Sequence, residues 1–262
     1  MRLFDALSAF VLLYCSEVWA VQYVDMVEKV QIKFLKLLLH LPLHTPDIYV
    51  RLETCQPHLK VKIFKRVLKW WHKLLLMPID SLPRICLIRL IELMDNQRLP
   101  FNWAKFLSVI LIDIGAHDIW HAQSPEVLQR NFNDLLEKFT NNCISRDINT
   151  ALDSRYNPYY RNILPSLNLT NNYLNFRIPT YRLSIIAQIR LASKKFPALY
   201  IKGTKNKFYP EKRCNYCLSE LDNLEHFFVN CSLLDALRNK WLSKYIDNSD
   251  PFVSLLDCMN SV

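Results

Sequence analysis

The chain has 262 residues, of which 51% are hydrophobic and 22% charged, a balance that excludes a disordered or collagen-like protein. It holds only two glycines, so a glycine-rich phosphate loop or dinucleotide-binding fingerprint is also excluded. Lys and Arg outnumber Asp and Glu by 33 to 24, a net charge of +9 that favours an anionic partner. The eight cysteines predict free thiols rather than a disulfide framework, and we expect an intracellular protein of the nucleus or cytoplasm.

Apolar residues recur at helical spacing along most of the chain, which predicts a mainly α fold with few strands. In chain order we expect helices over 26–41, 59–76, from Pro83 to before Pro100, 103–114, from Pro125 onward, and 181–195. Ser124 is expected to cap the helix that begins at Pro125. Helix 59–76 is rich in Lys and Arg and lacks acidic residues, which fits either phosphate contact or a plain solvated face.

A segment without acidic residues extends from Ser154 to Pro210 and interleaves Lys and Arg with aromatic residues. Cations can contact phosphates and rings can stack on unpaired bases, although a solvated basic face over an aromatic core gives the same pattern. Its first part, to Pro179, is rich in Tyr, Asn and Pro and predicts a linker or extended docking segment. The residues predicted to bind nucleic acid are Arg177, Arg182, Arg190, Lys194, Lys195, Lys202, Lys205, Lys207, Lys212 and Arg213.

The sharpest local pattern is a C-x2-C-x8-H-x4-C motif formed by Cys214, Cys217, His226 and Cys231. Three thiolates and one imidazole form a usual tetrahedral ligand set for Zn²⁺, so the motif predicts a closed, structural zinc knuckle. We expect Asp222 to cap a short helix that carries His226, with Cys231 just past the helix end. The alternative interpretation is a set of core cysteines beside a surface histidine.

Two stretches are specific enough to suggest a family: VEKVQIKF at 27–34, and LEHFF at 224–228 inside the Cys/His motif. With looser matches in the same order over nearly the whole chain, the sequence resembles the C-terminal region of LINE-type (non-LTR) retrotransposon reverse transcriptases. The resemblance implies a helical, thumb-like region followed by a basic linker and a zinc knuckle that helps to hold template RNA and target DNA. It also implies that the four motif residues match the family's zinc ligands and that the chain belongs to a retroelement ribonucleoprotein.

The chain departs from that family in two ways. Glycines are common in the family at three turns where this chain has Cys15, His40 and Gln56, so we expect these turns to be strained or rebuilt. The family's polymerase holds two metal ions through an Asp pair in a palm that would precede Met1, and this chain contains no Asp-Asp dipeptide. We therefore expect a non-catalytic fragment that binds RNA and/or DNA, with structural Zn²⁺ as cofactor and neither a membrane nor a small-molecule substrate as partner.

Four segments are expected: a thumb-like helical region at 1–100, a middle helical region at 101–165, a basic segment with the zinc knuckle at 166–235, and an acidic tail at 236–262. Two other functions stay open, a zinc-stapled protein-interaction module and a non-functional remnant of a retroelement. A metal-dependent hydrolase using His117 and His121 is disfavoured, because the intervening Asp118 is shorter than the Glu of zinc proteases and no third ligand is evident.

Overall fold

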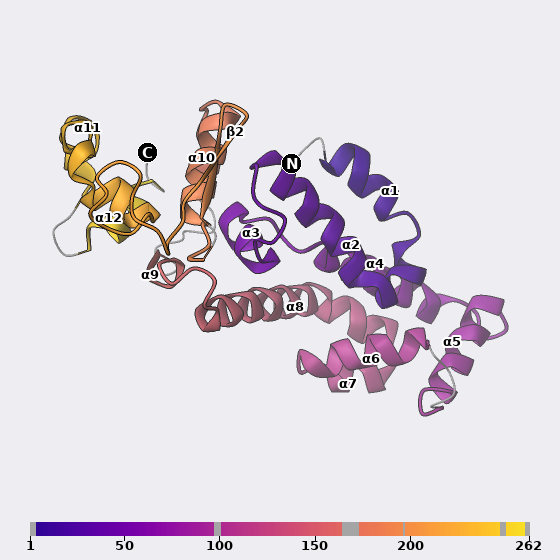
Figure 1. The fold of residues 1–262 in the computed structure, drawn as a ribbon. Coiled ribbons are helices and arrows are strands. Elements are labelled where there is room, and N and C mark those ends of the chain that lie inside the picture. The colour runs from indigo at the N-terminus through magenta and orange to yellow at the C-terminus, as the bar shows by residue number, and fades with distance from the viewer. Residues whose placement is uncertain (1–3, 97–100, 164–172, 196, 247–249, 260–262) are drawn as a thin grey trace. The chain divides into compact units, whose positions relative to one another are not determined.

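The computed structural model describes residues 4–96, 101–163, 173–195, 197–246 and 250–259, and it confirms a mainly α fold (Figure 1). The chain forms two compact units, each discontinuous in sequence. Unit 1 comprises Met1–Gln31 and Pro57–Arg146, and unit 2 comprises Ile32–Gln56 and Asp147–Val262. This division differs from the four consecutive segments expected, because residues 32–56 cluster with the C-terminal part of the chain.

Unit 1 is built from helices packed around aromatic pairs. It contains a π-helical turn at Phe4–Ala9, α1 (Phe10–Leu12), the first part of α2 (Ser16–Leu38), α4 (Leu59–Leu76), α5 (Leu82–Glu92), α6 (Trp103–Asp113), α7 (His117–Ala122) and most of α8 (Pro125–Asp153). The ring centroids of Trp71 and Trp120 lie 5.3 Å apart, and those of Phe64 and Phe139 lie 4.4 Å apart. Helix α4 has the predicted bounds because its buried residues recur every three or four positions.

The other helices of unit 1 follow the sequence less closely at their ends. Helix α2 begins at Ser16 rather than residue 26, with a kink at Tyr23. The predicted cap of α8 is confirmed, since the Ser124 hydroxyl accepts from the Val127 amide at 3.2 Å. Among the described residues, no single helix has the length and apolar composition of a membrane span, although Phe4–Leu12 and Ser16–Leu38 meet those criteria as a pair bent by 108°.

Unit 2 joins short helices to one β-hairpin. It contains the end of α2, α3 (Asp47–Thr54), the end of α8, α9 (Tyr160–Ile163), α10 (Thr180–Arg190), β1 (Ala198–Ile201), β2 (Thr204–Lys207), α11 (Asp235–Trp241) and α12 (Pro251–Cys258). Short 3-10 or π-helical turns lie at Tyr173–Asn175, His226–Asn230, Ser232–Leu234 and Ser243–Tyr245.

The hairpin was not predicted. Helix α10 ends at Arg190 instead of residue 195, and β1 begins at Ala198, pairs antiparallel with β2 and packs on α10 (Figure 1). The register runs from Ala198 opposite Lys207 to Ile201 opposite Thr204, and the two residues between the strands both have positive φ. Such a two-residue turn suits the twist of the strands, and Gly203 supplies one of its two left-handed positions.

The core of unit 2 contains a buried ion pair. Arg190 Nε donates to Glu53 Oε1 at 2.5 Å, and both side chains are 0% exposed. Tyr160 donates to the other oxygen of Glu53 at 3.1 Å, and Arg190 also donates to the Leu256 carbonyl. Four separate stretches of chain, including α12 in the expected acidic tail, are therefore joined at one buried charge pair.

These contacts correct two expectations. Arg190 cannot contact a nucleic acid as predicted, because its guanidinium is enclosed in the core of unit 2. The predicted linker is not extended at Tyr160 or Tyr173, whose rings are fully buried, while its residues 164–172 lie outside the described residues. Burial raises the pKa of both tyrosines well above the usual value, so both hydroxyls stay protonated.

The three turns that were expected to be strained contain left-handed backbone. Cys15 has a φ of 49° and His40 a φ of 51°, and at the third turn Cys55, not Gln56, has a φ of 51°. At His40 the Leu41 amide donates back to the Lys36 carbonyl at 2.8 Å, the bond of a Schellman motif that usually has glycine at this position. The expected strain is therefore present at Cys15 and His40, and at Cys55 in place of Gln56.

Candidate metal centre

The first two cysteines of the motif lie in a tight knuckle. The Cys214 amide donates to the Glu220 carbonyl at 2.7 Å, and the Leu218 amide donates back to the Cys214 carbonyl at 3.0 Å. Leu218 itself is left-handed, with a φ of 61°. These bonds fold residues 214–220 back on themselves, and a bridge between Arg213 and Leu221 closes the base of the knuckle.

His226 and Cys231 come from the helical turn that follows. Asn223 caps this turn, since its Oδ1 accepts from the His226 amide at 2.8 Å. The prediction that Asp222 is the cap is wrong, because its carboxylate instead accepts from the Tyr209 amide at 3.1 Å. The prediction for Cys231 is confirmed: it lies just past the turn, in extended backbone, with its amide bonded to the His226 carbonyl.

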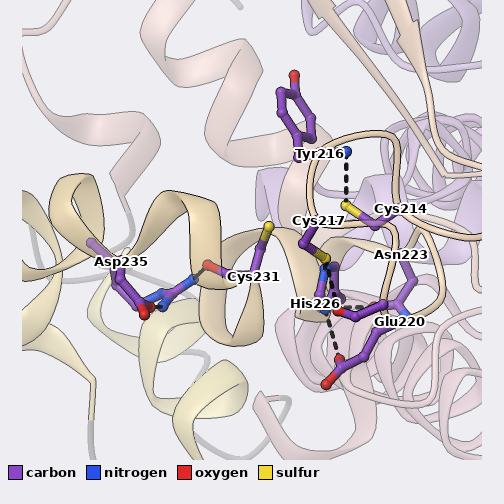
Figure 2. A network of polar contacts seen from close by, with 10 residues as sticks. Cys214, Tyr216, Cys217, Glu220, Asn223, His226, Cys231 and Asp235 are labelled. Carbon is purple, nitrogen blue, oxygen red and sulfur yellow. Dashed lines mark hydrogen bonds and ion pairs between the residues drawn. The ribbon is translucent and has the colours of Figure 1, made fainter.

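The four side chains converge on one point (Figure 2). Their ligand atoms all lie within 4.8 Å of one another, and His226 Nε2 is 3.1 Å from Cys217 Sγ. Tetrahedral coordination with Zn–S bonds near 2.3 Å separates two sulfurs by about 3.8 Å, which falls inside this range. The four residues can therefore hold one metal ion with small side-chain adjustments.

Burial distinguishes this centre from an open, catalytic one. Cys214, Cys231 and His226 are at most 3% exposed, and only Cys217 is partly exposed. Four protein ligands complete a tetrahedral shell, so they leave no position for water or substrate. Among the described residues, this is the one group of three or more Cys, His, Asp or Glu side chains placed to share a metal ion.

The sequence did not identify Glu220 as part of the centre. Its Oε2 lies 2.7 Å from His226 Nδ1, while Nε2 of the same ring faces Cys217 (Figure 2). A carboxylate that accepts from Nδ1 fixes the tautomer that leaves Nε2 free to bind a metal. The available signal was an acid between Cys217 and His226, but the sequence alone does not say which of three acids turns toward the ring.

One of the three thiols is also prepared for metal binding. Hydrogen bonds from the Ser219 hydroxyl and amide lower the pKa of Cys217 to about 6. Burial instead raises the pKa of Cys231. Arg238, which is paired with Asp235, donates to the Cys231 carbonyl at 2.8 Å and so fixes the end of the helical turn.

Nine of the ten predicted nucleic-acid-binding residues are exposed, and Arg190 is the exception. All of them belong to unit 2, as do the four residues of the Cys/His cluster. Lys212 and Arg213 directly precede Cys214, and the Asp222 amide donates to the Lys212 carbonyl at 2.9 Å. The knuckle therefore fixes the backbone beside part of the exposed basic set.

The alternative site at His117 and His121 has two potential ligands only. Their Nε2 atoms lie 2.8 Å apart on the exposed side of α7, while Trp120 is buried. Among the described residues, no third potential ligand joins them in a metal-binding group. Comparison with models of known protein families, with curated proteins and with solved structures found no match to this chain.

Proposed function

We propose that this chain is a non-catalytic nucleic-acid-binding module in which a structural Zn²⁺ ion holds the basic part together. One observation carries the proposal: nine of the ten cations predicted to bind nucleic acid are exposed, and they belong to the unit that contains the Cys/His cluster. Zinc is proposed because three thiolates and one imidazole are a ligand set that it prefers, and because the four-ligand shell is closed.

RNA or DNA is proposed as the partner because phosphate groups match the charge of this surface. The sequence has no acid between Ser154 and Pro210, so the charged side chains of this stretch are all cations. Each phosphate contact releases condensed counterions, which makes binding to such a surface strongly dependent on salt. No catalytic step is assigned, because the ligand shell is complete without a substrate.

We also propose that the module derives from the C-terminal region of a LINE-type retrotransposon reverse transcriptase, with unit 1 corresponding to the thumb-like part. The left-handed backbone at Cys15 and His40 supports this origin. These are positions where the family commonly has glycine, the residue that adopts such backbone at no steric cost.

The proposal is tested with zinc-loaded protein in a fluorescence anisotropy assay against single-stranded RNA, single-stranded DNA and duplex, over a series of salt concentrations. We expect binding that weakens steeply with salt, one bound zinc per chain, and loss of both in the variant with Cys214→Ser and Cys217→Ser. The control variant with Cys86→Ser and Cys258→Ser, two cysteines outside the cluster, should keep its zinc content and its nucleic-acid binding. Salt-insensitive binding, or none, would refute the nucleic-acid function.

A further inference from the structure

We propose that a basic groove in unit 2, formed by two adjoining hollows, binds the phosphate backbone of a single-stranded nucleic acid, with Tyr209 stacking on a base. This inference rests on the proposed function and assigns it to one place. All residues that line the two hollows belong to unit 2. The hollows adjoin because Lys195 and Glu211 line both of them.

The first hollow has a volume of about 910 Å³ and gathers cations from two distant stretches of chain. Arg155 and Arg161 come from the segment after α8, whereas Lys194 and Lys195 follow α10. The Lys194 amide donates to the Tyr156 carbonyl at 3.0 Å, which holds the two stretches side by side. The two arginines are not among the residues predicted to bind nucleic acid, because only this pairing brings them to the two lysines.

The second hollow, of about 540 Å³, extends the cationic surface to the hairpin. Lys205 and Lys207 line it from β2, and His44 lines it from the segment between α2 and α3. Tyr209 lines this hollow and is 37% exposed, and the Lys212 ammonium lies 4.8 Å from the centroid of its ring. A ring beside a row of cations is the arrangement that binds unpaired strands, since every base can stack and every phosphate can pair.

The groove cations lack internal carboxylate partners. Within the described ranges, no ion pair is formed by Arg155, Arg161, Lys194, Lys195, Lys205 or Lys207. The cations elsewhere are often paired, as Lys62 with Asp5 and Arg146 with Asp113 are in unit 1. Six cations around a single acid, Glu211, leave a strong positive potential in the groove.

The metal centre fixes one wall of this groove. The Tyr209 amide donates to the Asp222 carboxylate, and the Lys212 amide donates to the Tyr209 carbonyl at 2.8 Å. Asp222 is in turn held between the knuckle and the turn that carries His226. Metal binding should therefore order Tyr209 as well as the cysteines.

Neutralising the groove is the first test, with fluorescent oligothymidylate and oligouridylate as separate probes. In the variant with Arg155→Gln and Lys195→Gln we expect affinity to fall about tenfold and the salt slope to decrease by about 1.4, since each single-strand phosphate contact contributes about 0.7. The matched control changes two exposed cations of unit 1, Lys105→Gln and Arg130→Gln, with the same loss of charge. This control variant should have the affinity and the salt slope of the wild-type chain.

Two further variants test the groove: one is expected to raise the affinity for single strands and the other to lower it. Glu211→Gln should raise affinity severalfold because it removes the acid shared by both hollows, whereas Glu137→Gln on α8 should not. Tyr209→Ala should weaken single-strand binding at least about fivefold while Tyr209→Phe keeps it, since stacking needs the ring only. Zinc content and far-ultraviolet circular dichroism check that each variant is folded.

The outcomes separate the groove from the proposed function. If the wild-type chain binds no nucleic acid, the proposed function fails and the groove with it. If it binds but the groove variants behave like the unit 1 control, the groove is refuted and the function stands. Equal affinity for an acidic peptide such as polyglutamate would also refute the groove's assignment to nucleic acid.

Discussion

Replacing Arg190 by Met should destabilise unit 2 more than the loss of one positive charge from an exposed residue. Arg190 and Glu53 are both fully buried, and their charged atoms are 2.5 Å apart. Removing the cation leaves the Glu53 carboxylate in the core without its charge partner, and it also leaves the Leu256 carbonyl without the guanidinium donor. Breaking a buried pair in this way costs about 3–5 kcal/mol.

The double variant Arg190→Met with Glu53→Leu should recover part of this loss. Without the isolated carboxylate, the remaining cost comes from unpaired groups such as the Tyr160 hydroxyl, at about 1–3 kcal/mol each. We therefore expect the double variant to be at least about 1 kcal/mol more stable than Arg190→Met alone.

Hydrogen exchange followed by mass spectrometry measures these differences within unit 2, from peptides of α3, α10 and α12. The control is Arg89→Met, which breaks the exposed Arg89–Glu92 pair of unit 1 and should cost less than about 1 kcal/mol. If Arg190→Met costs no more than Arg89→Met, or if the double variant is no more stable than Arg190→Met alone, the buried pair does not hold unit 2 together as argued.

The other predictions concern turns and the metal centre. His40→Gly should stabilise the chain by about 1 kcal/mol in thermal or chemical denaturation, because it relieves left-handed backbone in a Schellman turn. Gly115→Ala should have the opposite effect in the equivalent turn, where the Ala116 amide donates to the Leu111 carbonyl; changes of the same sign would contradict the argument. Glu220→Gln should weaken metal affinity about tenfold in a competition titration with a chromophoric chelator, since the carboxylate that orients His226 is lost; unchanged affinity would exclude that role.

Local patterns predicted most of the helices and the four side chains of the Cys/His cluster. Helix α4 has its expected ends because one apolar stripe determines them, and the Cys/His spacing identified side chains that the structure brings together. The hairpin was missed because β1 and β2 have four residues each and β2 is exposed throughout, so neither shows the alternating burial of a strand. Asn223 and Asp222 are adjacent and equally suited to capping, so only the structure shows which one bonds to the His226 amide.

Long-range pairing could not be predicted from one sequence. Arg190 could not be distinguished from the other predicted binding cations, because the sequence gives no sign that it pairs with Glu53, 137 positions away. The groove could not be predicted for the same reason, since Arg155 and Arg161 become binding candidates only beside Lys194 and Lys195. Residue type predicts charge, but the fold decides whether that charge meets a carboxylate or solvent.

The discontinuity of unit 2 has a consequence for synthesis and for dissection of the chain. Glu53 leaves the ribosome long before Arg190 and Leu256 exist, and all of Pro57–Arg146 is made in the interval. Contacts of such high sequence separation form late, so unit 2 cannot complete its core before Leu256 has been made. An expression fragment that starts after Arg146 would contain the whole metal centre but lack the carboxylate that Arg190 needs, so it should be a poor substitute for the full chain.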